Sequence, residues 1–367
     1  MRHWAFGLSK LAAGILIVSA AAQAQPVSDK IISQHVRLRI PVEREWLGRD
    51  SIMDLERCWR FVNGATGERL PRKILVVIAW DKQSSFADPD SATISIGMND
   101  PSASPNLRKF LIHSAAREMA RMGVLELARG IADREGSEFL FEGMSEILAR
   151  EFDHSARSLE GAWVVAHFLD RMKLLGLEAQ SRWSEFSGGR QDLWAASPGI
   201  TFLLTCRELH GRERLVKLFE ALRKNSLERS LAIAFKGPAA SLESAWLKKV
   251  RGYNVFENVS RGSDDEVPVL ERTEFAPAAG RPGSTLAIKL FLRSGARELP
   301  PDEVFVLDEA SGRVARARLA SERGSIHKVA EIAIEPERKP GQYSYRVTAV
   351  DNSGNVGNWV GAYAVER

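Results

Sequence analysis

Residues 113–123 read HSAAREMARMG and belong to a longer stretch, LRKFLIHSAAREMARMG, at 107–123. Apolar side chains recur there every three or four residues, which predicts an amphipathic helix. Arg117 and Arg121 stand four positions apart, and Glu118 directly follows the first of them. Because residues at i and i+4 share one helix face, the sequence presents two guanidinium groups side by side.

A second stretch, FLFEGMSEIL at 139–148, places two carboxylates one helical turn apart. These are Glu142 and Glu146, and twenty residues separate Arg121 from Glu142. The apolar residues around them again follow a helical period. Two neighbouring helices would therefore bring two arginines and up to three carboxylates together.

The order of elements over about residues 35–250 resembles the gluzincin branch of zinc metallopeptidases, the peptidase MA-like clan. REMAR (117–121) stands where that family has His-Glu-x-x-His, and FLFEGMSEIL is similar to its Trp-Leu-x-Glu-Gly-x-x-Glu segment. The resemblance implies that Glu118 holds the position of the general base and Glu142 that of the third zinc ligand. It also implies that Glu146 holds the position of the carboxylate that orients the first histidine.

The departures from the family pattern concern the chemistry itself. Both histidine positions are arginine, and no two of the seven histidines are four residues apart: 3, 35, 113, 154, 167, 210 and 327. A guanidinium stays protonated and cannot ligate zinc. The first tyrosine is Tyr253, and the segment where the family often has Ser-Tyr reads Ser197-Pro198, so the usual oxyanion donor is also absent. We therefore expect no bound metal and no active catalytic residue, Glu118 being vestigial; zinc held by atypical ligands is the alternative.

Two arginines can replace a lost dication, because paired carboxylates repel each other unless a positive charge lies between them. We expect Arg117 to contact Glu146 and Arg121 to contact Glu142, with bidentate geometry available to each. The alternative interpretation is an unrelated helical domain in which these arginines form an ordinary solvated face.

The chain as a whole is predicted to be of the α+β class, with a separate all-β domain at its end. The helical pattern continues to about residue 258, and short, evenly spaced strands with Gly, Pro and Asn turns then indicate an Ig-like sandwich. The expected organisation is a signal peptide at 1–24, an N-terminal α/β lobe at 25–105, a helical lobe at 106–258, a linker at 259–268 and the sandwich at 269–367.

The first residues have the features of a secretory signal peptide. A basic start precedes the apolar run LAAGILIVSA at 11–20, and Ala22-Gln23-Ala24 fits the cleavage rule. Ten apolar residues are too few to span a bilayer, which needs about 20. We expect a periplasmic or secreted protein with no membrane span after cleavage. Cys58 and Cys206 are then in an oxidising compartment, where they either pair or remain buried thiols.

Charge excludes one class of partner. The formal net charge of +4 falls to +2 when Arg2 and Lys10 are removed with the leader (4 − 2), and no basic run is interleaved with aromatic residues. Nucleic-acid binding therefore has no electrostatic basis here.

Our first functional hypothesis is a non-catalytic, peptidase-like protein that binds a peptide or an envelope protein. Extended peptide would add to an edge strand, for which ATISIGM at 92–98 is the candidate, with Thr93, Ile94, Ser95 and Ile96 as binding residues. The other hypotheses are a metal-dependent peptidase with atypical ligands and a purely structural envelope protein.

Several other residues attract attention without defining a site. The stretch 351–359, DNSGNVGNW, is typical of a polar hairpin and resembles a calcium loop only in its alternating oxygens. His154 and His167 lie on separate helical segments, and three tryptophans are more typical of core than of a binding groove: Trp163, Trp183 and Trp194.

Overall fold

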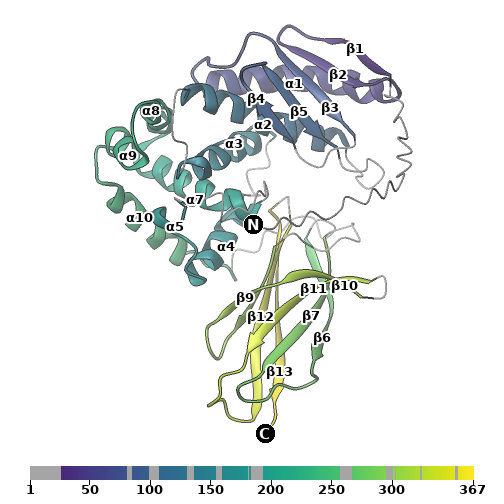
Figure 1. Ribbon diagram of the computed structural model, residues 1–367, viewed down its shortest axis with the longest axis vertical. Helices are drawn as coiled ribbons and strands as arrows, with labels where there is room; N and C mark the ends of the chain where they lie inside the picture. The colour runs from purple at the N-terminus through teal and green to yellow at the C-terminus, as the bar shows by residue number, and fades with distance from the viewer. Residues whose placement is uncertain are drawn as a thin grey trace, which may run out of the picture.

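The protein combines helices and sheets in three consecutive parts, as Figure 1 shows for the computed structural model. The predicted leader, most of the predicted linker, His154 and Trp183 lie outside the residues that the structure describes. The described residues are 26–80, 85–98, 107–129, 136–153, 159–180, 182, 193–256, 267–294, 301, 303–322, 325–351 and 354–367.

A five-stranded sheet forms the first part, in the order β1-β2-β3-β5-β4. Strands β2, β3 and β5 are parallel, whereas β1 and β4 run antiparallel to their neighbours. Helix α1 (Glu45–Ala65) connects β2 to β3, as a parallel connection requires. The strands are β1 (Val27–Ile32), β2 (Val36–Pro41), β3 (Ile74–Ala79), β4 (Phe86–Asp88) and β5 (Thr93–Gly97).

The expectation that 92–98 offers a free sheet edge is wrong. Strand β5 lies between β3 and β4, and Ile94, Ser95 and Ile96 are buried. The edge strand is instead β4, whose residues Phe86 and Asp88 pair with Ser95 and Thr93. Only three residues of a Ser- and Asp-rich segment form this strand, so its sequence resembles a turn. The sequence pattern therefore did not indicate it.

Helices make up the second part of the chain (Figure 1). The helix carrying REMAR is α2, the helix carrying FEGMSE is α3, and the two lie side by side. The helices are α2 (Leu107–Leu127), α3 (Glu138–Phe152), α4 (Leu159–Arg171), α5 (Leu177–Gln180), α7 (Leu193–His210), α8 (Glu213–Leu222), α9 (Leu227–Phe235) and α10 (Ala239–Arg251).

Two antiparallel four-stranded sheets form the third part, in the orders β10-β11-β7-β6 and β13-β12-β8-β9. Apolar residues from both sheets pack into one core, among them Ile288 and Leu290 from the first sheet and Val347 from the second. The strands are β6 (Pro268–Ala276), β7 (Thr285–Ser294), β8 (Glu303–Asp308), β9 (Val314–Arg316), β10 (Arg318–Glu322), β11 (Ser325–Ala333), β12 (Gly341–Val350) and β13 (Val356–Val365).

This third part packs directly against the helices. The ring of Phe305 stacks on Phe168 of α4 with 4.5 Å between ring centroids. The Arg316 guanidinium lies 3.9 Å from the ring centroid of Trp194, the second residue of α7. Gly161 of α4 also lies so close to Gly354 that an added Cβ would come within 2.7 Å of its Cα. The strand-rich part is thus anchored to the helical part by aromatic contacts.

Two further sequence expectations concern cysteines and membrane spans. Cys58 and Cys206 are both buried free thiols in the structure, so they do not pair. Within the described residues, none of the helices has the length and apolar character needed to cross a bilayer.

Candidate functional site

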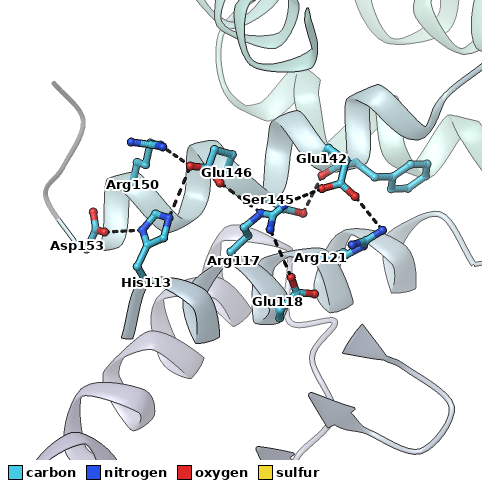
Figure 2. A network of polar contacts seen from close by, with 10 residues as sticks. His113, Arg117, Glu118, Arg121, Glu142, Ser145, Glu146, Arg150 and Asp153 are labelled. Carbon is cyan, nitrogen blue, oxygen red and sulfur yellow. Dashed lines mark hydrogen bonds and ion pairs between the residues drawn. The ribbon is translucent and has the colours of Figure 1, made fainter. Parts of the chain in front are cut away.

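Helices α2 and α3 bring the residues singled out in the sequence into one cluster (Figure 2). Arg117 and Arg121 lie one turn apart on α2, and Glu142 and Glu146 lie one turn apart on α3. Because α2 and α3 pack side by side, the two arginines face the two glutamates. The helical period of each motif therefore creates the site once the helices pack.

Glu142 is held between the two arginines. Nη2 of Arg117 donates to Oε2 of Glu142 at 2.8 Å. Nη2 of Arg121 lies 2.8 Å from the other carboxylate oxygen, Oε1. The Glu142 side chain is only 2% exposed. Each of its oxygens thus has a guanidinium partner.

Glu146 has a different set of cations around it. Nε of Arg117 lies 3.3 Å from Oε2 of Glu146. Arg150, one turn further along α3, donates from Nε to Oε1 at 2.5 Å. His113 approaches the same oxygen with Nε2 at 3.6 Å, and its Nδ1 lies 2.7 Å from Oδ2 of Asp153. Both ion pairs expected from sequence, Arg117–Glu146 and Arg121–Glu142, are present, and Arg117 bridges both glutamates.

His113, Arg150 and Asp153 were not expected to take part. Their spacing contains a signal, since His113 lies four residues before Arg117 and Arg150 four residues after Glu146. This places both on the same helix faces as the motif residues. Asp153 lies just past the end of α3, where helical spacing no longer predicts the direction of a side chain. These residues extend the cluster by one turn.

Glu118 is the least satisfied member of the cluster. Its side chain is fully buried, and neither carboxylate oxygen has a hydrogen-bond partner. The nearest charge is Nη1 of Arg117 at 3.8 Å from Oε1. A buried carboxylate without hydrogen bonds costs free energy, so packing alone gives no reason for a glutamate here.

The charges shift the pKa values of the cluster in opposite directions. Burial raises the pKa of Glu146, but Arg150, His113 and Arg117 lower it more, and the net pKa lies well below 4.5. Burial raises the pKa of Glu118, and the arginines offset only part of this, so its net pKa is above 4.5. Burial lowers the pKa of His113, yet hydrogen bonds to Asp153 and Glu146 leave it above 6.5. The cations around Glu146 therefore favour its ionised form, whereas burial makes the ionised form of Glu118 less favourable than it is for a free glutamate.

These residues do not fit a zinc ion. Zinc is held by imidazole, thiolate or carboxylate groups, usually in a tetrahedron. Both oxygens of Glu142 contact guanidinium groups, and neither Arg117 nor Arg121 can act as a ligand. Within the described ranges, no group of three or more His, Cys, Asp or Glu residues is arranged to hold a metal ion. The contacts within this cluster are ion pairs between guanidinium and carboxylate groups.

Glycines at the crossing of α3 and α7 position Glu142. A Cβ added to Gly143 would come within 2.3 Å of the Gly199 carbonyl carbon, and one added to Gly199 would lie 1.9 Å from the Phe139 carbonyl oxygen. Both positions therefore need glycine, because the two backbones touch. Gly199 follows the Ser197-Pro198 pair, which lies buried inside α7. This contact fixes the part of α3 that carries Glu142.

The other residues singled out in the sequence contribute to packing and to turns, as far as they lie in the described part of the chain. Trp163 and Trp194 are buried, and Nδ1 of His167 contacts the Val250 carbonyl. Asp351 accepts hydrogen bonds from the backbone and side-chain nitrogens of Asn355, which is typical of a polar turn before the last strand.

Comparison with known proteins gives distant structural likeness. No protein-family model and no curated protein matches the chain. The chain is similar to a solved M1 zinc metallopeptidase from Deinococcus radiodurans, at 15% identity and a TM-score of 0.36, covering 62% of this chain and 51% of that one. It is also similar to an aminopeptidase N family protein from Idiomarina loihiensis, at 10% identity and a TM-score of 0.39, covering 91% and 68%. The chain thus spans about half the length of the M1 structure.

Proposed function

We propose that this protein is a non-catalytic relative of the gluzincin metallopeptidases that binds peptide or protein without cleaving it. The observation that carries the proposal is the pair of contacts on Glu142, at 2.8 Å from Arg117 and 2.8 Å from Arg121. In the resemblance stated above, Glu142 holds the position of a zinc ligand. Two guanidinium groups occupy the lone pairs that a metal would need.

Glu118 supports the same ancestry. The family resemblance places the general base at this position, and a base is useful only where it meets a substrate or a metal-bound water. Here the carboxylate is buried with no hydrogen-bond partner. A residue retained from a former catalytic site explains this cost better than packing does.

Peptide would bind at the edge strand β4. Within the described residues, β4 stands at the end of the sheet and pairs only with β5. An unpaired edge offers backbone N–H and C=O groups to an extended peptide. Phe86 is 44% exposed on this strand and offers an apolar contact. The secreted or periplasmic location expected from the leader would place such a site among envelope polypeptides.

The third part of the chain would serve as an Ig-like interaction or packing module. The order β10-β11-β7-β6 on one sheet and β13-β12-β8-β9 on the other supports this, because immunoglobulin folds also divide their antiparallel strands between two packed sheets.

The proposal is tested by incubating the mature chain with a mixture of unstructured peptides. We expect peptides to be retained and recovered intact, with or without a chelator. Phe86→Asp, on β4, should reduce peptide retention. Met53→Asp is the control: it changes an exposed apolar residue on α1, away from β4, and should leave retention unchanged. Chelator-sensitive cleavage would support the metallopeptidase alternative, and no retention of any peptide would support a purely structural role.

A further inference from the structure

Around Glu142, the two arginines of α2 are more exposed than the carboxylates that they contact. Arg121 is 24% exposed and Arg117 is 14% exposed, whereas Glu142 is 2% exposed and Glu118 is fully buried. A molecule approaching the cluster therefore meets guanidinium groups first. The carboxylates lie behind them and hold them in place.

The exposed side of α2 continues this surface in both directions. Five residues at spacings of three and four along this helix keep part of their surface exposed. Phe110 stands at one end and Leu125 at the other, so apolar side chains flank the two cations. The five are Phe110, Ser114, Arg117, Arg121 and Leu125.

The guanidinium groups are rigidly placed for recognition. Arg117 is fixed by Glu142 and Glu146, and Arg121 by Glu142, so ordering them costs little further entropy when a ligand binds. All three nitrogens of Arg117 already face carboxylates, so Arg117 contributes its charge to a ligand. Arg121 is the more exposed of the two, and its planar fork matches the geometry of a ligand carboxylate.

We propose that Arg117 and Arg121 bind a carboxylate carried by an extended peptide, either its C-terminal carboxylate or an Asp or Glu side chain. This inference rests on the proposed peptide-binding function and names its ligand class. The site that would polarise a carbonyl in a zinc peptidase instead recognises a negative charge, and β4 supplies main-chain pairing nearby on the sheet packed against α2.

Four pools of random hexapeptides test the proposal on the full mature chain. All are N-terminally acetylated; they carry either a free acid or an amide at the C-terminus, and either contain or lack Asp and Glu. Enrichment on the immobilised protein is read by mass spectrometry. Preference for free acids in both compositions identifies the C-terminal carboxylate, and preference for Asp- or Glu-containing amides identifies the side chain. Either result supports the proposal.

Two other outcomes overturn it in different ways. If the amide pool that lacks Asp and Glu is enriched as strongly as the three pools that carry a carboxylate, carboxylate recognition is refuted and peptide binding is not. No enrichment from any pool by the folded protein would refute peptide binding itself, and the inference with it.

Variants then assign the contact. For an enriched peptide, Arg121→Gln should weaken binding about tenfold or more, the effect of losing a charge-assisted hydrogen bond. Arg121→Lys keeps the positive charge but loses the planar fork of N–H donors. Its affinity for the peptide should lie between those of the parent and of Arg121→Gln. Arg229→Gln on α9 removes an exposed arginine elsewhere and should bind as the parent does. Circular dichroism confirms that each variant is folded, and unchanged affinity in folded Arg121→Gln would exclude this site.

Discussion

Arg117 on α2 and Glu142 on α3 form a largely buried ion pair, with 2.8 Å between Nη2 and Oε2 and side-chain exposures of 14% and 2%. The same guanidinium reaches Glu146 through Nε at 3.3 Å. One side chain thus contacts two carboxylates that lie one turn apart on α3 and would otherwise repel each other.

Replacing Arg117 with alanine should therefore destabilise the helical part strongly. Removing one partner of a buried ion pair costs about 3–5 kcal/mol. Arg117 contacts both Glu142 and Glu146, so its loss takes one cation from each carboxylate and leaves Arg121 beside the first and Arg150 beside the second. Arg121→Ala should cost less, since Arg121 is more exposed and its ion pair is with Glu142, which keeps Arg117 as a partner. Urea denaturation followed by circular dichroism measures both.

Arg49→Ala is the matched control for these variants. Arg49 pairs with Glu45 on the surface of α1, where its side chain is 72% exposed, and an exposed pair contributes about 0–1 kcal/mol. If Arg117→Ala and Arg121→Ala unfold at the same urea concentration as Arg49→Ala, the arginines form an ordinary solvated face.

Glu118→Gln should stabilise the protein, and increasingly so at higher pH. The folded-state pKa of Glu118 is raised above 4.5, so its favourable contribution is complete below that pH and is lost as pH rises through the folded pKa. Glutamine removes the cost of burying the ionised form. The difference in unfolding free energy between variant and parent, measured from pH 4 to pH 8, should grow with pH. A variant less stable than the parent at pH 8 would show that Arg117 needs the Glu118 charge.

His113 should add a second pH dependence. Its folded pKa is raised above 6.5 by Asp153 and Glu146, against burial and the opposing charge of Arg150. The stabilisation is present below 6.5 and disappears as pH rises through the raised pKa. Titration of the His113 ring by NMR reads this pKa directly, and His113→Gln should flatten the fall in stability on that side. A ring that titrates below 6.5 would contradict the contacts described.

Local patterns in the sequence predict only part of this site. Helical spacing places Arg117 beside Arg121 and Glu142 beside Glu146, because residues four apart share a face. The expectation that these two faces meet comes from the family resemblance. The edge of the sheet was predicted wrongly, since β5 has the alternating pattern while β4, only Phe86–Asp88, has almost none. Strand order depends on long-range pairing that a local pattern does not contain.

Local patterns also fail to predict the residues that hold the cluster in place. The need for glycine at Gly143 arises from a backbone contact with Gly199, more than fifty residues away in the chain. Asp153 meets His113 through the packing of α2 on α3, not through any spacing within one helix. Local periodicity therefore predicts which face a residue occupies, and the tertiary contacts decide which faces meet.

Restoring the histidines tests whether the geometry of a metal site is inherited. The double variant Arg117→His, Arg121→His should bind one zinc ion tightly, because Glu142 then loses its arginine partners and becomes available as a third ligand. Isothermal titration calorimetry measures the affinity. Adding Glu142→Gln to the double variant should abolish binding, and a folded double variant that binds no zinc would mean that residues 117, 121 and 142 do not converge on one point.

The zinc content of the purified, unmodified protein reports directly on whether Glu142 is available to a metal ion. Because both oxygens of Glu142 are engaged by Arg117 and Arg121, we predict far less than one zinc per chain by inductively coupled plasma mass spectrometry, even after incubation with zinc and gel filtration. A content of about one zinc per chain, the ratio of a dedicated site, that is lost in Glu142→Ala would contradict the account and identify a metal centre with atypical ligands.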